Sequence, residues 1–191
     1  MNGDHLLESA TGYARERLSD KRFDHTLRVA ETAERLAGLH GLDPAKARLA
    51  GLLHDVARET DGDELLRIAA KNSLPVGDPE REKPMLLHGP VAAELAEIDL
   101  EMRDEAVLEA VRVHTTGAPG MGPLSLVVFV ADKIEPGREG DWVEELRELA
   151  EKDLGEAARA SLESSISFNE GRGRAIHPRS REALEWLKGK G

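Results

Sequence analysis

The chain has 191 residues, with 37 acidic and 26 basic side chains and a net charge of −11, which suits one globular domain and argues against broad binding to nucleic acid. Cysteine is absent, so disulfides, thiolate metal ligands and cysteine nucleophiles are excluded, and any metal must be bound by histidine and carboxylate. No apolar stretch approaches the length that spans a bilayer, and residues 1–20 carry mixed charges rather than a signal-peptide pattern, so we expect a cytoplasmic protein with no membrane partner.

Apolar residues recur at intervals of three and four through most of the chain, whereas strict alternation is nearly absent. The pattern predicts an all-α fold, a single helical domain over residues 1–191. In the first half, Asp43 and Asp61 provide N-caps and Pro44 suits a first helical turn. The helices expected here cover about residues 3–18, 24–41, 44–56 and 61–71.

The stretch over residues 72–84 contains three prolines and a glycine, and it is predicted to be a loop and not a helix. Helices resume at about residues 90–97 and 104–114, before a second breaker of glycines and prolines over residues 117–123. The valine-rich run over residues 124–131 fits a buried strand or a buried helix, and we expect a helix because no partner strand is present. The remaining expected helices cover about residues 142–150, 154–166 and 181–188.

The charge is uneven along the chain. Residues 170–191 have a net charge of +3, so residues 1–169 carry −14. The basic residues of this tail are Arg172, Arg174, Arg179, Arg181, Lys188 and Lys190. An acidic body with a basic tail indicates that the protein handles an anion locally.

Four of the seven histidines, His25, His54, His88 and His114, fall on predicted helices or at their ends. His25 and His114 continue the apolar stripes of their helices, and His54 lies within an apolar run. Inward-pointing imidazoles are costly unless each is hydrogen bonded or bound to a metal. One such residue alone is usually a satisfied core histidine, but four together indicate a metal site.

Two aspartates accompany these histidines. Asp55 follows His54 directly, and because helical neighbours diverge by about 100°, such a pair can bind one metal only at the inner end of a helix. Asp132 ends the most hydrophobic run of the chain, which carries its carboxylate toward the interior. A cation would offset the cost of burying this carboxylate. The alternative for Asp132 is exposure at a helix end or an ion pair with Lys133.

The ordered set His25, His54-Asp55 and Asp132 resembles the HD-domain superfamily of metal-dependent phosphohydrolases, and the segments around these residues resemble the YqeK family within it. The segments that carry this likeness are Lys21-Arg22-Phe23-Asp24-His25-Thr26, Leu53-His54-Asp55, Leu87-His88-Gly89-Pro90-Val91, His114-Thr115-Thr116-Gly117 and Ala131-Asp132-Lys133-Ile134-Glu135-Pro136-Gly137-Arg138. An isolated His-Asp dipeptide carries no information, whereas this ordered set over about residues 20–138 is specific.

The resemblance implies a symmetrical bis(5′-nucleosyl)-tetraphosphatase, which cleaves diadenosine tetraphosphate into two ADP, with a metal core at about residues 20–138 and a nucleotide-contacting loop and C-terminal helices at about 141–191. The implied ligands of the principal metal are His25, His54, Asp55 and Asp132. His88 and His114 are implied as ligands of a second metal or as phosphate contacts, and they form the catalytic group with a bridging Asp55. Substrate contacts are implied for all of these residues except His54, and for Arg22, Arg138, Arg172 and Arg174.

The donor set also limits the chemistry. Nitrogen and oxygen ligands without sulfur suit iron, manganese, nickel or zinc, as one or two ions, and the family favours iron. A metal on such ligands generates hydroxide from bound water, so a metal-bound hydroxide can attack phosphorus without a side-chain nucleophile. A tetraphosphate carries about four negative charges, and its approach to an acidic protein requires the metal and arginine forks.

Two other functions stay open from the sequence. One is an HD-domain nucleotidase or guanosine-tetraphosphate hydrolase, because groups at the periphery of a shared metal core set the substrate. The other is a non-catalytic sensor that binds a metal and ADP or a related nucleotide. Whether the chain forms a homodimer is also open. The remaining histidines, His5, His40 and His177, are predicted to be surface or capping residues.

Overall fold

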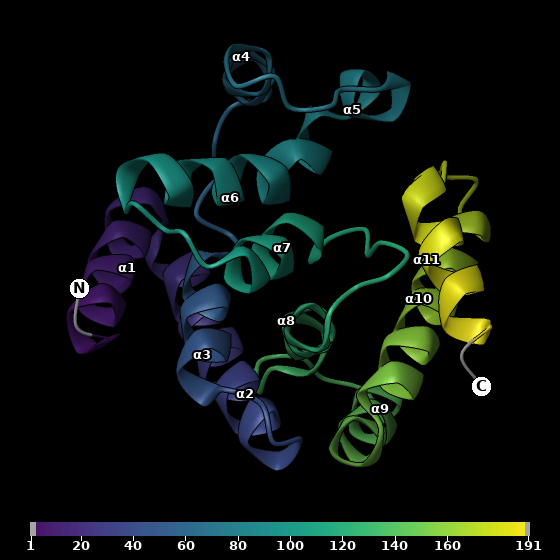
Figure 1. The fold of residues 1–191 in the computed structure, drawn as a ribbon. Helices are drawn as coiled ribbons and strands as arrows, with labels where there is room; N and C mark the ends of the chain where they lie inside the picture. The colour runs from purple at the N-terminus through teal and green to yellow at the C-terminus, as the bar shows by residue number, and fades with distance from the viewer. Residues whose placement is uncertain (1–2, 190–191) are drawn as a thin grey trace.

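The computed structural model describes residues 3–189, and all regular structure in this part of the chain is helical, which confirms the all-α prediction (Figure 1). The elements are α1 (Gly3–Arg17), α2 (Asp20–Leu39), α3 (Pro44–Leu53), α4 (Gly62–Lys71), α5 (Asp78–Glu82), the 3-10 helix η1 (Pro84–Leu87), α6 (His88–Asp99), α7 (Glu105–Val113), α8 (Pro123–Ile134), α9 (Asp141–Lys152), α10 (Leu154–Glu170) and α11 (Pro178–Lys188). No helix among the described residues is long and apolar enough to cross a membrane. Lys190 of the basic tail lies outside the described residues.

Helix α8 lies at the centre of the fold, in contact with α2, α3, α7, α9 and α10 (Figure 1). The five consecutive residues from Val127 to Ala131 are all buried. A helix that is apolar on every side is stable only when other elements surround it. The packing thus explains why this run shows no amphipathic period, and it confirms that the run is a helix.

Helices α2 and α3 approach each other closely at Gly51. A Cβ atom built on Gly51 would lie 2.6 Å from the Cα atom of Ala30 on α2, so only glycine permits this distance between the two backbones. Helix α3 ends two residues later, at Leu53. The close contact therefore holds the residues that follow α3 against the N-terminal half of α2.

Three helices begin at N-cap aspartates, and the sequence marks two of these as caps, Asp43 and Asp61. Asp43, Asp61 and Asp104 each accept hydrogen bonds from backbone N–H groups in the first turn of α3, α4 and α7. These contacts satisfy donors that have no partner within the helix. The cap positions predicted from sequence are confirmed.

The prediction that residues 72–84 form a loop is wrong in part, because α5 and η1 begin within this stretch. Pro79 and Pro84 stand in the first turns of these short helices, where proline costs no hydrogen bond. The Glu80 side chain also accepts from the Gly77 N–H at 2.9 Å, which secures the start of α5. Proline breaks a helix from inside but is compatible with its first turn.

Helix α2 begins at Asp20 rather than near Asp24, where the sequence predicts it. The residue before it, Ser19, donates from its backbone N–H and its hydroxyl to the carboxylate of Glu59, at 2.6 and 2.7 Å. This contact joins residues that are far apart in sequence, so the local pattern does not reveal it. Its consequence is an extra turn of helix ahead of His25.

Candidate metal centre and adjoining pocket

Four histidines and two aspartates meet in the interior, and each of them is at least nine-tenths buried: His25, His54, Asp55, His88, His114 and Asp132. They come from five elements. His25 lies on α2, and His54 and Asp55 directly follow the inner end of α3. His88 begins α6, His114 follows α7, and Asp132 lies in the last turn of α8. The structure thus brings together every residue that the sequence proposes as a metal ligand.

Asp55 lies between two pairs of histidines. Its Oδ2 atom is 3.5 Å from Nε2 of His54 and 3.9 Å from Nε2 of His25. Its Oδ1 atom is 3.2 Å from Nε2 of His88 and 3.7 Å from Nε2 of His114. His25, His54 and Asp55 form one cluster, and Asp55, His88 and His114 form a second. Within each cluster the candidate ligand atoms lie within 4.8 Å of one another. Two clusters therefore share one carboxylate, which is the arrangement that a bridging ligand needs.

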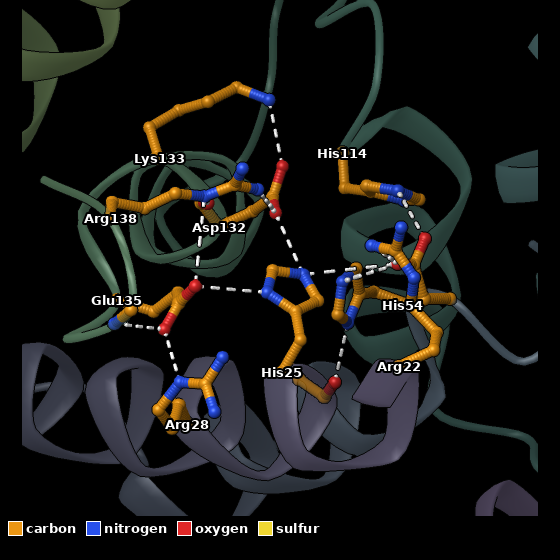
Figure 2. A network of polar contacts seen from close by, with 12 residues as sticks. Arg22, His25, Arg28, His54, His114, Asp132, Lys133, Glu135 and Arg138 are labelled. Carbon is orange, nitrogen blue, oxygen red and sulfur yellow. Dashed lines mark hydrogen bonds and ion pairs between the residues drawn. The ribbon is translucent and has the colours of Figure 1, made fainter. Parts of the chain in front are cut away.

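Asp132 extends the first cluster. Its Oδ1 atom lies 3.2 Å from Nε2 of His25, and Figure 2 shows this carboxylate pointing toward the imidazole from the end of α8. Burial acts to raise the pKa of Asp132, but Lys133 and His25 hold the pKa well below its usual value. The ionised carboxylate is the form that binds a cation.

Hydrogen bonds at Nδ1 fix all four imidazole rings in the same sense. His54, His88 and His114 donate from Nδ1 to the carbonyls of residues 51, 85 and 111, at 2.6, 2.6 and 2.8 Å. His25 donates from Nδ1 to Oε1 of Glu135 at 3.1 Å. Because carbonyl and carboxylate oxygens only accept, Nδ1 carries the proton in each ring and the Nε2 lone pair faces the centre.

The inward Nε2 atoms fit a metal because a protein donor is available to at most one of the four. Buried Nε2 of His25 and of His54 has no hydrogen-bond partner among the described residues. The Nε2 atoms of His88 and His114 lie 3.0 Å apart, and both present lone pairs. The hydroxyl of Thr115 is within 3.2 Å of both, but it can donate only one proton. Lone pairs and carboxylates that converge in a buried site require a cation to offset their repulsion.

Protonation states agree with this interpretation. Burial lowers the pKa of His54 to about 4, and burial also lowers the pKa of His88. Burial acts to raise the pKa of Asp55, but the surrounding histidines, His54 first, hold the pKa well below its usual value. Near neutral pH the centre therefore presents neutral imidazoles at His54 and His88 and ionised carboxylates at Asp55 and Asp132, which are the states that metal ligands adopt.

Three cationic side chains border the centre at its exposed side. Arg22 donates to Oδ2 of Asp55 at 3.1 Å, Arg138 to Oδ1 of Asp132 at 3.0 Å, and Lys133 to Oδ2 of Asp132 at 2.7 Å. All three are partly exposed. Arg22 and Arg138, which the family resemblance implies as phosphate contacts, thus lie beside the centre, and Lys133 adds a third cation there.

A cavity of about 700 Å³ adjoins the centre, and Lys133 and Thr115 line it on that side. Phe129, Ile166 and Ile176 contribute apolar walls from α8, α10 and the following loop. Helix α5 and η1 provide further lining residues, opposite the C-terminal segment. The cavity is therefore a mixed polar and apolar pocket that opens beside the proposed metal ligands.

Arg172 and Arg174, the two predicted substrate contacts in the C-terminal tail, lie in different surroundings. Arg174 lines the pocket, whereas Arg172 is absent from its lining and places its guanidinium 4.1 Å from the ring centroid of Phe168. Phe168 is about half exposed, so this pair lies at the surface. Only one of the two residues is therefore placed to contact a molecule in the pocket.

His177 joins the two sides of the pocket. Its Nδ1 atom accepts from the Arg179 N–H at the start of α11, which confirms the predicted capping role. Its Nε2 atom lies 2.8 Å from Oε1 of Glu80 on α5, a contact that sequence reasoning missed. His40 ends α2 as a C-cap and contacts the Ala150 carbonyl at 2.7 Å, and His5 is exposed. The predictions for these three histidines agree with their positions.

Glu135 is the main residue of the centre that sequence reasoning missed. It is 2 % exposed, and it contacts His25, Arg28 and the Gly137 N–H. Burial acts to raise the pKa of Glu135, but the contacts with Arg28, the Gly137 N–H and His25 together keep the pKa below its usual value. Its position three residues after Asp132 was the available signal, since that spacing returns to the same side of a helix end.

Comparison with known proteins agrees with this geometry. The HD domain family model matches residues 22–137. The chain is 36% identical to the symmetrical bis(5′-nucleosyl)-tetraphosphatase of Bacillus subtilis over 94% of this chain and 96% of that protein. It is 40% identical to the protein of the same name from Staphylococcus aureus, over 75% of this chain and 74% of that one.

A solved structure with the same fold comes from Clostridium acetobutylicum and is described as a predicted HD superfamily hydrolase involved in NAD metabolism. Its TM-score is 0.93 at 38% sequence identity, and the match covers 96% of this chain and 97% of that one. The likeness extends past the matched domain into the C-terminal helices that line the pocket.

Proposed function

The chain belongs to the HD-domain family and, within it, to the symmetrical bis(5′-nucleosyl)-tetraphosphatases, and from this premise we propose that it hydrolyses diadenosine tetraphosphate to two ADP. The relatives that carry this name match most of the chain, including its C-terminal part. The reaction breaks one phosphoanhydride bond with water. A metal-dependent hydrolase therefore needs a cation site, counter-charges for phosphate and a pocket that sets the register of cleavage.

The observation that carries the proposal is the convergence of four Nε2 lone pairs and two carboxylates in a site with no protein donor for two of those nitrogens. His25, His54, Asp55 and Asp132 would hold the principal ion, and His88 and His114 with Asp55 a second one. The nitrogen and oxygen donors suit iron, manganese, nickel or zinc, and the family resemblance favours iron among them. Such an ion supplies hydroxide from water at neutral pH and polarises a phosphoryl oxygen.

The cationic residues explain how an acidic protein receives a polyanion. Arg22, Arg138 and Lys133 hold positive charge beside the centre through their contacts with Asp55 and Asp132. Guanidinium forks bind phosphate oxygens bidentately, so the two arginines orient the chain of phosphates across the centre. Their partial exposure leaves N–H donors available to a ligand.

The pocket supports the symmetric register. A cavity of about 700 Å³ has the size that a small-molecule site requires, and it combines apolar walls with a few polar groups. We place one ADP half of the substrate in it, with Arg174 near its phosphates. The anhydride bond beyond that half then lies at the metal centre, so water attacks at the second phosphorus from the bound nucleoside.

The test is the identity of the products. Purified protein is loaded with ferrous iron, manganese, nickel or zinc in the absence of oxygen and incubated with diadenosine tetraphosphate, and ADP is expected as the only nucleotide product. Formation of AMP and ATP would contradict symmetric cleavage. Tight ADP binding without turnover under any metal would indicate a sensor instead. A parallel panel with nucleoside monophosphates and guanosine tetraphosphate distinguishes the other HD-domain activities.

A further inference from the structure

His25 differs from the other histidines of the centre in what holds its ring. His54, His88 and His114 are each held by a carbonyl three residues earlier in their own segment. His25 lies inside α2, where backbone carbonyls serve the helix. Its Nδ1 atom instead donates to Glu135, which comes from the segment after α8 (Figure 2). The orientation of this ring thus depends on a side chain from a distant part of the sequence.

Glu135 is itself held in place by two donors. The Nε atom of Arg28 and the N–H of Gly137 donate to its Oε2 atom at 2.5 and 2.6 Å, which leaves Oε1 to accept from His25 at 3.1 Å and to pair more distantly with Nε of Arg138 at 3.7 Å. A Cβ atom at Gly137 would lie 2.7 Å from Nη2 of Arg28 and 2.9 Å from Oε2 of Glu135, so glycine leaves the room that this pair needs. The carboxylate is therefore fixed before any metal binds.

A carboxylate that accepts from Nδ1 fixes the tautomer of a histidine and makes its other nitrogen a stronger ligand. In this centre that nitrogen is Nε2 of His25, which lies 3.2 Å from Oδ1 of Asp132 and has no donor. We propose that Glu135 is a positioning residue, which orients His25 and increases the affinity of the centre for a divalent metal. The proposal rests on the proposed function only in that the centre binds such a metal.

The experiment measures metal affinity directly, without substrate. Metal-free protein is titrated with Co²⁺ against a competing chelator, for the unmodified chain and for Glu135→Gln, Glu135→Ala and Arg28→Met. Expected affinities are about 10-fold lower for Glu135→Gln, which keeps an acceptor but loses the charge, and about 100-fold lower for Glu135→Ala. Arg28→Met keeps the Glu135 carboxylate but removes a hydrogen bond that holds it in place, so the Co²⁺ affinity should fall about threefold.

The control is Glu151→Gln, which removes a carboxylate that also pairs with an arginine of α2, Arg35, at 2.7 Å but at the surface. Its Co²⁺ affinity should stay within about twofold of the unmodified chain. The visible spectrum of bound Co²⁺ provides a second readout, which should change in Glu135→Gln and not in Glu151→Gln. Urea unfolding of the metal-free variants measures stability separately.

Three results would contradict the proposal, and each one points to a different cause. Equal Co²⁺ affinity and an equal spectrum in the Glu135 and Arg28 variants would overturn the positioning role while leaving the metal centre intact. A lower unfolding midpoint with unchanged affinity of the folded protein would assign Glu135 a structural role only, and would also overturn the proposal. Failure of the unmodified chain to bind Co²⁺ would contradict the metal centre itself, and with it the proposed function.

Discussion

The metal centre and the adjoining pocket share Lys133 and Thr115, yet they are built in different ways. Every proposed ligand of the centre is buried, and every imidazole has its Nδ1 atom held by a carbonyl or carboxylate. Most residues that line the pocket are half-buried or exposed. Two of its sides come from α5 and from the segment before α11, and the contact between Glu80 and His177 joins them. Changes in the centre should therefore affect the chemical step or the fold, whereas changes at the pocket should affect substrate binding.

The largest effect is expected for Asp55→Ala. Among the residues that the structure describes, Asp55 is the one carboxylate within 4 Å of all four histidines, so its removal should reduce the hydrolysis rate about 1,000-fold or more. The circular dichroism spectrum should stay helical, because the core of apolar side chains is unchanged. Substantial activity in this variant would mean that the shared carboxylate is not part of the reaction centre.

The second-largest effect is expected at Gly51, where α3 packs closely against α2. Gly51→Ala places a methyl group within 2.6 Å of the Ala30 Cα atom, and backbone atoms cannot move aside cheaply, so we expect a loss of about 3 kcal/mol in the free energy of unfolding. Gly38→Ala on α2 is the control, because the nearest atom would lie at 4.0 Å. It should stabilise the protein by about 0.5 kcal/mol through helix propensity. Urea unfolding measures both, and equal values would refute the close approach.

Acid should destabilise the metal-free protein through the centre. His54 accepts a proton at about pH 6.5 when unfolded but only at about pH 4 when folded, so the unfolded state binds more protons between these values. The free energy of unfolding therefore falls as the pH drops, by on the order of 3 kcal/mol at pH 4 from His54 alone. Burial lowers the pKa of His88 as well, in the same direction. Urea unfolding at a series of pH values tests this, and a flat profile between pH 7 and pH 4 would contradict it.

At the border between the two regions, Arg138→Ala should mainly raise KM, by about 10-fold, because it removes binding that substrate and transition state share. Arg138 is partly exposed and contacts Asp132, so it reaches from the centre toward the solvent. Steady-state kinetics with diadenosine tetraphosphate separates KM from kcat. A reduced kcat with unchanged KM would place Arg138 with the centre rather than with substrate binding.

The smallest effect distinguishes the two tail arginines. Arg174 lines the pocket and Arg172 does not, so Arg174→Ala should raise KM about threefold while Arg172→Ala changes it by less than twofold. Both variants remove the same charge, which controls for long-range attraction of the substrate. Equal effects would show that the tail acts through its net charge and not through the pocket.

Most of the centre was predictable from sequence because buried polar residues break a regular pattern. His25 and His114 stand on apolar stripes, and Asp132 ends an apolar run, so each one is conspicuous where only apolar side chains are expected. The caps at Asp43 and Asp61 were predictable for a different reason, because capping depends on residues that are close in sequence.

The residues that sequence reasoning missed act through contacts between distant segments. Glu135 contacts His25 on α2, His177 contacts Glu80 on α5, and Glu59 caps the start of α2 through Ser19. The spacing of residues within one helix or loop carries no information about contacts between such distant segments. The sequence pattern misses α5 because proline signals a helix break, whereas Pro79 stands in the first turn of α5 and Pro84 in that of η1.

Three of the histidines have a double task. The rings of His54 and His114 donate to carbonyls in the last turns of α3 and α7, and the ring of His88 does so for η1. Replacing one of them would remove a hydrogen bond at the end of a helix together with a proposed metal ligand. A lineage that no longer needed the enzyme could not discard these imidazoles at little cost to folding. Descendants that have lost activity should therefore change first at the arginines and at the pocket, and retain the histidines longest.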